Sequence, residues 1–293
     1  MSGPRVVALG GGHGLAASLQ AARHYAGEVT GIVSVADDGG SSGRLREAFG
    51  IPAPGDLRRC LVALADAETP WARAFEYRFE AGELEGHALG NLVIAGLAAA
   101  TGDFAAALTE VGRLLGLDHR GRVLPATIGP VDLKAQVDGA EVVGQVHVQD
   151  ARGPITAVSL VPPDAAPPPE AVAAIQAADQ VVIGPGSLYT SVLAVLAVPA
   201  LRDAVAARRH GRVYVCNLRP QVPETADYNA AAHVAALRAH GIRPDVVVHD
   251  PAAMPAGRLD VPVVEAELGR PGDLGHDPEK LAAVLARLAR LAP

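Results

Sequence analysis

The chain has 293 residues, enough for one large α/β domain or two modest ones. Hydrophobic residues make up 49% of it and aromatic residues only 3%, so Ala, Val and Leu must supply a core of helices packed on a sheet rather than an aromatic-lined sandwich. The net charge of −7 argues against a nucleic-acid partner, because such proteins normally carry a basic face.

The cysteines and the apolar segments indicate an intracellular protein. Cys60 and Cys216 are the two cysteines, and each lies inside an apolar segment, which predicts buried free thiols. The N-terminus lacks the pattern of a signal peptide, and no segment has the roughly 20 unbroken apolar residues of a membrane span. We therefore expect a cytoplasmic protein with no membrane span.

The first elements follow the order strand, glycine loop, helix, strand. Arg5–Leu9 is an apolar run that ends at Gly10–Gly14, a helical pattern covers Leu15–Tyr25, and Val29–Val35 is a second apolar run. This order is typical of an α/β fold with a Rossmann-like, doubly wound, mostly parallel sheet.

The glycine loop between these elements is a candidate phosphate site. It matches the dinucleotide fingerprint only in part, because Leu15 stands where the last glycine belongs. Bare backbone amides at a helix N-terminus still bind anions, which makes candidates of Gly11, Gly12, His13 and Gly14. His13 either donates to a phosphate or is an exposed loop histidine.

The stretch Ser34–Arg46 joins two acids, several small residues and two arginines. Asp37 and Asp38 are candidates to hold a metal ion or a ribose, and the arginines to neutralise phosphate. The intervening small residues allow backbone to approach an anion, so we include Gly39, Gly40, Ser41 and Ser42. The alternative is a turn-rich connection, with Arg44 structural.

Two further polar clusters lie in the helical region that follows. Asp56 is predicted to cap a helix over Leu57–Leu64, and Arg58 in its first turn is a ligand candidate. After a helix at Trp71–Phe79, a helix over His87–Ala100 would place His87 and Asn91 on one face. Asn91 is a candidate ligand, although both side chains could also bond protein backbone.

From Val123 the pattern changes to short strands linked by turns. An antiparallel meander inserted into or beside the parallel sheet is predicted from four runs, Val123–Thr127, Val131–Val137, Val142–Gln149 and Ile155–Leu160. The proline-rich segment Pro162–Pro169 is the best boundary candidate. The remaining predicted elements are helices at Glu170–Ala178, Tyr228–His240 and Asp277–Leu291, and strands at Val181–Ile183, Val213–Asn217, Asp245–His249 and Val261–Val264.

A second strand–glycine–helix junction follows Ile183. Gly186, Ser187 and Thr190 can supply amides and hydroxyls to a phosphate, and Ser187 can cap the helix that continues through Val195. Asn217 ends another buried strand. Ligands of open α/β sheets lie beyond the carboxyl ends of strands, where all of these polar clusters fall.

Taken together, these motifs resemble the gluconeogenesis factor family, the YvcK-type branch of the CofD-like proteins. The motifs that carry the resemblance run in the family's order over nearly the full length: Gly10–Leu15, Val35–Arg46, Pro54–Arg58, Gly86–Leu92, Arg122–Pro125, Gly184–Ser191 and Val213–Leu218. One departure is His13, which stands where the family's first loop usually has threonine. A bulkier ring then shares the phosphate loop.

The resemblance implies a single CofD-like domain over residues 1–293, divisible into a nucleotide-binding core (1–121 and 170–293) and an antiparallel insertion (122–169). It implies a protein that binds a UDP-linked sugar such as UDP-N-acetylglucosamine and that regulates cell shape and peptidoglycan synthesis on gluconeogenic carbon. Asn217 and Tyr228 are carried to the nucleotide site by family position. The excess of apolar helices suggests a homodimer.

An enzyme of the CofD type is the alternative function. The related branch consists of 2-phospho-L-lactate transferases that use magnesium, and its paired acids match Asp37 and Asp38. Whether this chain catalyses a reaction is left open. A nicotinamide dehydrogenase is disfavoured, since Leu15 breaks the fingerprint, although a diphosphate site would also accept NAD or GDP.

Overall fold

A computed structural model describes residues 3–117, 121–270 and 275–291, and its centre is a seven-stranded parallel sheet. The sheet order is β10-β9-β8-β7-β1-β2-β3, and every neighbouring pair is parallel. The strands are β1 (Arg5–Gly10), β2 (Glu28–Val33), β3 (Gly121–Pro125), β7 (Gln180–Ile183), β8 (Arg212–Val215), β9 (Val246–His249) and β10 (Val263–Glu265). The order reverses between β1 and β7, which is the doubly wound pattern predicted from the sequence.

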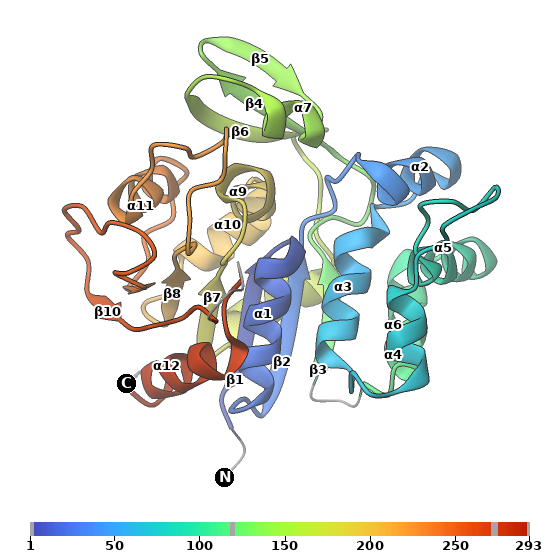
Figure 1. The fold of residues 1–293 in the computed structure, drawn as a ribbon, viewed down its shortest axis with the longest axis horizontal. Coiled ribbons are helices and arrows are strands. Elements are labelled where there is room, and N and C mark those ends of the chain that lie inside the picture. Colours follow the sequence, from blue (N-terminus) through green and yellow to red (C-terminus); the bar gives the residue numbers. More distant parts are fainter. Residues whose placement is uncertain (1–2, 118–120, 271–274, 292–293) are drawn as a thin grey trace.

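Helices cover both faces of this sheet, which explains why β1, β2 and β7 are apolar runs rather than alternating patterns. Helix α1 (Gly12–Arg23) packs between α3 (Pro54–Leu64) and α12 (Pro278–Leu291), while α8 (Pro169–Ala177) packs against α10 (Pro199–Ala206) (Figure 1). The other helices are α2 (Gly40–Phe49), α4 (Pro70–Glu76), α5 (Leu89–Thr101), α6 (Phe104–Leu114), α9 (Leu193–Leu196), preceded by a π-helical turn η1 (Leu188–Val192), and α11 (Ala230–Ala239).

A small antiparallel sheet lies beyond the carboxyl ends of the parallel strands (Figure 1). Its order is β5-β4-β6, formed by β4 (Asp132–Val137), β5 (Ala140–Val143) and β6 (Ile155–Val161). The predicted meander is therefore present, but its first strand was misplaced. Val123–Thr127 corresponds to β3, which pairs in parallel with β2 at the edge of the large sheet.

The third predicted meander strand is also wrong over most of its length. Val142–Gln149 divides into the end of β5 and helix α7 (Gln145–Asp150). Gly144 separates them with φ of +102°, a conformation that favours glycine. The amides of Gln145 and Val146 then donate to the carboxylate of Asp38 at 3.0 Å each, so a residue distant in sequence caps this helix.

Two helix starts differ from the sequence prediction. The small residues after Asp38 do not form a loop, because α2 begins at Gly40 after the extended Gly39. Helix α5 begins at Leu89 rather than His87, with Ala88 extended at its N-cap. His87 and Asn91 therefore do not share a helix face.

Two further features concern the cysteines and the helices that could span a membrane. Cys60 and Cys216 are both free and buried. Within the described ranges, no single helix is long and apolar enough to cross a bilayer, and only the bent pair Leu188–Leu196 with Pro199–Ala206 meets that test in combination.

Candidate functional site

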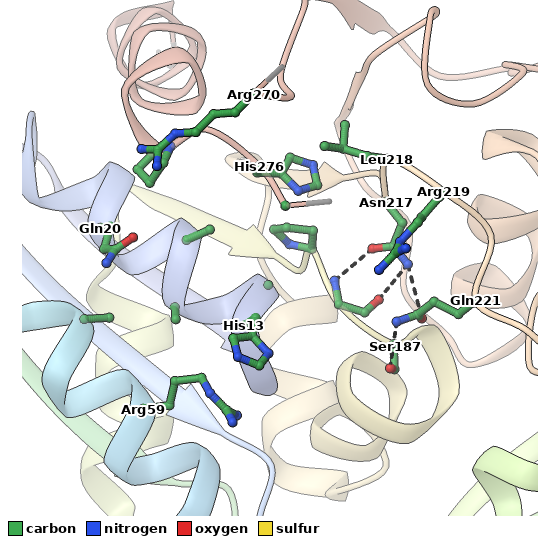
Figure 2. A pocket seen from close by; sticks show the side chains of 18 of the residues that line it. His13, Gln20, Arg59, Ser187, Asn217, Leu218, Arg219, Gln221, Arg270 and His276 are labelled. Atoms are coloured by element: carbon green, nitrogen blue, oxygen red, sulfur yellow. Dashed lines mark hydrogen bonds between the residues drawn. The ribbon is translucent and has the colours of Figure 1, made fainter. Parts of the chain in front are cut away.

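The two glycine junctions meet at the point where the strand order reverses. They touch directly, since a Cβ added to Gly14 would lie 2.3 Å from the carbonyl oxygen of Pro185. A cavity of about 870 Å³ opens beside this contact. Figure 2 shows His13 and Arg59 on one side of it and Ser187, Asn217 and Arg219 on the other. Of the predicted site residues, five line this cavity: His13, Gly14, Gly186, Ser187 and Asn217.

The first junction is occupied by a carboxylate of the chain itself. The amide of Gly12 donates to Asp56 Oδ2 at 2.6 Å, and Arg59 Nη1 donates to Asp56 Oδ1 at 2.6 Å. Gly11 is glycine for a steric reason, because an added Cβ would lie 2.7 Å from Asp56 Oδ2. Asp56 was predicted to cap α3, but α3 begins earlier, at Pro54, and Asp56 instead joins its first turn to α1. This carboxylate lies where the loop would otherwise receive an anion.

His13 projects from the first turn of α1 into the cavity (Figure 2). Partial burial lowers its pKa below the ordinary 6.5, and the positive charge of Arg59 adds to the shift. The neutral imidazole, which can give one hydrogen bond and accept one, therefore predominates at pH 7.

The second junction is held by the segment that follows β8. Asn217 and Gly186 form a reciprocal pair, with the Gly186 amide donating to Asn217 Oδ1 and Asn217 Nδ2 donating to the Gly186 carbonyl, both at 2.9 Å. Gln221 Nε2 donates to Ser187 Oγ at 2.9 Å (Figure 2). These bonds fix the loop Gly186–Ser187 from outside its own helix, so Ser187 accepts a hydrogen bond rather than capping η1 with its side chain.

A buried carboxylate, which the sequence analysis missed, also occupies the second junction. Glu224 is only 6% exposed, and it accepts from the Tyr189 amide at 2.6 Å and from Thr190 Oγ1 at 3.0 Å. Burial raises its pKa above the ordinary value, against the lowering effect of these hydrogen bonds. The hydroxyl of Thr190 is therefore turned toward Glu224, and Thr190 does not line the cavity.

Tyr228 lies behind the second junction. Its hydroxyl and that of Tyr189 are 2.7 Å apart, and its ring packs edge-on against His233. Tyr228 is not among the residues that line the cavity. The structure therefore brings Asn217 to the cavity wall but leaves Tyr228 outside it, against Tyr189.

The acid pair Asp37–Asp38, which follows β2, lies outside this cavity. Its two carboxylates bond different partners. Asp37 accepts from the Gly39 amide at 2.9 Å, and burial raises its pKa. Asp38 uses both carboxylate oxygens to cap α7. Among the residues that the structure describes, no group of three or more His, Cys, Asp or Glu side chains is arranged to hold a metal ion. Each carboxylate of the pair thus bonds backbone amides of its own, and the assignment of the pair to magnesium stays a prediction.

The serines of the same stretch belong to a buried polar cluster. Ser41 Oγ is 3.0 Å from His87 Nδ1 and accepts from Asn91 Nδ2 at 3.0 Å. Asn91 donates, so the Ser41 hydroxyl is free to donate to His87, whose pKa is lowered by burial and the nearby arginines. Asn91 Oδ1 is buried without a hydrogen-bond partner in the described part of the chain. Ser42 packs under Gly55, where an added Cβ would meet its Oγ at 2.1 Å.

The arginines near this cluster contact carbonyl or carboxylate oxygens of the chain itself. Arg58, a predicted ligand candidate, is 2% exposed and donates from Nη1 to Glu76 Oε2 at 2.9 Å and to the Phe75 carbonyl at 3.2 Å. Arg44 donates to the Glu85 carbonyl at 2.9 Å. Gly39 and Gly40 start α2, and Gly40 needs its φ of +50° there. Several side chains of the stretch thus hold α2, α5 and α7, while Asp38, Gly40 and Arg44 also line a second cavity of about 730 Å³, so its role as a ligand site stays a prediction.

The comparisons with known proteins identify the family of this chain. Residues 6–271 match the family model described as "2-phospho-L-lactate transferase CofD". A "Gluconeogenesis factor" from Bacillus subtilis is 44% identical over 239 residues, covering 81% of this chain and 75% of the relative. The chain belongs to the CofD family, in its gluconeogenesis factor branch.

Other members of this family are similar over most of their length. A "Gluconeogenesis factor" from Halalkalibacterium halodurans is 44% identical over 254 residues, covering 85% of this chain and 78% of the relative. A crystal structure of a protein from Bacillus halodurans superposes with a TM-score of 0.91 at 36% identity and covers 97% of this chain and 99% of its own. The parallel sheet with its small antiparallel companion is thus the fold of the family.

Proposed function

We propose that this chain binds a UDP-linked sugar, with UDP-N-acetylglucosamine as the representative ligand, in the cavity between the two glycine junctions. The observation that carries the proposal is the contact of Gly14 with Pro185, which joins both junctions into one wall at the switch point of the sheet. The cavity volume of about 870 Å³ lies in the range of small-molecule sites, roughly 300–1,000 Å³.

The polar groups of the cavity wall suit a neutral, hydroxyl-rich ligand part. Asn217, Gln221 and Ser187 are already ordered by their mutual hydrogen bonds. Groups fixed in this way lose little side-chain entropy when a sugar or a base binds beside them. Their position at the carboxyl ends of β7 and β8 is where α/β sheets bind nucleotides.

Calorimetry tests the proposal. We expect binding heat with UDP-N-acetylglucosamine and none when the cavity is filled by Ala17→Trp, since Ala17 lines it on α1. The matched control is Ala99→Trp, an exposed alanine of α5 that does not line the cavity. The absence of both binding heat and thermal stabilisation of the unmodified chain at millimolar ligand would contradict the proposal.

In the cell, we propose a regulatory role in cell shape and peptidoglycan synthesis during growth on gluconeogenic carbon. The name of the relatives supports the link to gluconeogenic growth, and the family resemblance of the sequence motifs suggests the link to cell shape and peptidoglycan. Loss of the gene should then deform cells on gluconeogenic carbon but not on glucose, and Ala99→Trp should restore shape where Ala17→Trp does not. Equal rescue by both variants would separate the cellular role from the cavity.

Magnesium-dependent phosphotransfer is the competing function, and it is supported by the description of the family model. It would need Asp37 and Asp38 to hold one ion between a nucleophile and a phosphate. Asp38 instead caps α7 with both oxygens, so the observed geometry favours binding without transfer. A phosphorus NMR assay that shows magnesium-dependent transfer, abolished by Asp38→Asn, would reverse this preference.

A further inference from the structure

Both helix N-termini at the switch point already hold a carboxylate of this chain. Asp56 Oδ2 lies 2.6 Å from the amide of Gly12, and Glu224 Oε1 lies 2.6 Å from the amide of Tyr189. A phosphate at either terminus would lie against an acidic side chain and would compete with it for the same amides. Like charges this close repel strongly at the edge of a protein interior. The negative charge of a ligand must therefore be met elsewhere on the cavity wall.

Most charges around the cavity are already compensated. Arg59 is paired with Asp56 at 2.6 Å, Arg270 with Asp277 at 3.2 Å, and Glu76 with Arg58 at 2.9 Å. The two histidines of the wall add no positive charge at pH 7. Burial lowers the pKa of His276 to about 4, and the pKa of His13 is lowered as well.

Arg219 is the exception among the cations of the wall, as Glu224 is among its carboxylates. Among the described residues that line the cavity, it is the one arginine whose side chain has neither an ion pair nor a hydrogen bond. Its side chain is exposed and lies beside Asn217 at the edge of the second junction (Figure 2). A guanidinium offers a planar fork of donors that matches phosphate oxygens.

The backbone of Arg219 is held on both sides. Two residues before it, Asn217 forms the reciprocal pair with Gly186, and two residues after it, Gln221 bonds Ser187. Pro220 further restricts the chain between these anchors. Only the side-chain rotamer of Arg219 has to be ordered when an anion binds, so the entropic cost of the contact is small.

We propose that Arg219 neutralises the diphosphate of the ligand, which then lies between the two helix N-termini at the second-junction side of the cavity and on neither terminus. This inference rests on the proposed function for the identity of the nucleotide sugar. The recognition of a diphosphate by Arg219 is independent of which nucleoside or sugar is attached.

The test uses inorganic pyrophosphate, followed by phosphorus NMR, and UDP-N-acetylglucosamine, followed by calorimetry. Arg219→Gln should weaken the binding of both roughly 10- to 100-fold, the range of a charge-assisted hydrogen bond. Arg219→Lys should lose less than Arg219→Gln, because it keeps the charge without the fork. The matched control is Arg270→Gln, which removes an arginine of the same cavity that is already paired and should change either affinity by less than about threefold.

The outcomes separate this inference from the proposed function. Unchanged binding of both probes by Arg219→Gln, or a larger loss from Arg270→Gln, would overturn the role of Arg219. Pyrophosphate binding that depends on Arg219, without any binding of UDP-N-acetylglucosamine, would support the role of Arg219 and refute the nucleotide sugar. If the unmodified chain binds neither probe, both proposals fail. Thermal unfolding of each variant verifies that the fold is retained.

Discussion

Both glycine junctions follow the order strand, glycine loop, helix, and each holds a carboxylate. They differ in what compensates the charge of that carboxylate. At the first, Asp56 is partly exposed, with a side-chain exposure of 19%, and Arg59 compensates its charge. At the second, Glu224 is 6% exposed, and its described partners are an amide and a hydroxyl rather than a cation. The first junction is therefore an ion pair that solvent can reach, and the second is a buried carboxylate that depends on hydrogen bonds. Substitutions at the two junctions should therefore differ in how much they lower the free energy of unfolding and in how that loss depends on pH.

The largest effect is expected where the two junctions touch. Gly14→Ala forces a Cβ to within 2.3 Å of the Pro185 carbonyl, so α1 and the second loop must separate. We expect a loss of about 3 kcal/mol in the free energy of unfolding, because backbone cannot give way as a side chain can. Urea denaturation at pH 7 measures it.

The control for this change is Gly12→Ala in the same loop. An added Cβ there has nothing within 4 Å, and the cost comes only from its φ of +62°. Such backbone strain should cost about 1 kcal/mol. Equal losses from the two substitutions would show that the junctions are not in contact as described.

The second effect is at Glu224. Glu224→Ala leaves the Tyr189 amide and the Thr190 hydroxyl buried without their acceptor, which should cost about 2 kcal/mol of unfolding free energy. Thr190→Val removes only the hydroxyl bond and should lose less. If Glu224→Ala unfolds no more easily than the unmodified chain, the second junction is not held by this carboxylate.

Glu224 should also make the free energy of unfolding depend on pH. Its folded pKa is raised by burial above the ordinary 4.5, so between these two values the folded chain binds more protons than the unfolded one. Stability from this group is present below pH 4.5 and is lost as pH rises through the folded pKa. Glu224→Gln should remove that part of the decline. The pKa of Asp37 is also raised, so the difference between the two chains, rather than either curve alone, isolates Glu224.

The third effect tests the first junction. Asp56→Ala removes the acceptor of the Gly12 amide and should cost about 1 kcal/mol, less than at Glu224 because the site is partly solvated. It also frees Arg59, which lines the cavity, so pyrophosphate should bind more tightly. Glu110→Ala is the control, since it breaks an exposed ion pair three residues apart on α6, away from the cavity. Weaker pyrophosphate binding by Asp56→Ala would mean that Asp56 helps rather than hinders an anion.

The fold was predictable from sequence where local pattern and tertiary structure agree. Strands β1, β2 and β7 are apolar runs, β1 and β7 lead directly into glycines, and both glycine junctions are evident from spacing. Helix α2 was missed because glycine and serine have low helix propensity, and its first turn depends on packing against α5 and α3. Helix α7 was missed because its cap, Asp38, comes from a distant part of the chain.

The site was predictable only in part, for a related reason. The glycines at Gly14 and Gly186 and the amide side chain of Asn217 carry local signals. The carboxylates that occupy the helix N-termini do not, since Asp56 reaches a loop 44 residues away and Glu224 one 35 residues away. Arg219 has no motif either. It stands out only once the partners of the other cavity charges are known.

The smallest expected effect concerns Tyr228, which the family resemblance assigns to the nucleotide site. Tyr228→Phe removes the bond between its hydroxyl and that of Tyr189 and should cost about 0.5 kcal/mol of unfolding free energy. Nucleotide affinity should not change, because Tyr228 lies behind the second junction rather than in the cavity wall. Calorimetry with UDP-N-acetylglucosamine measures the affinity, with Arg219→Gln as the comparison. A tenfold loss from Tyr228→Phe would mean that the second junction opens when ligand binds, so that its rear layer becomes part of the site. The description of the second junction as a closed, hydrogen-bonded cluster around Glu224 would then be wrong.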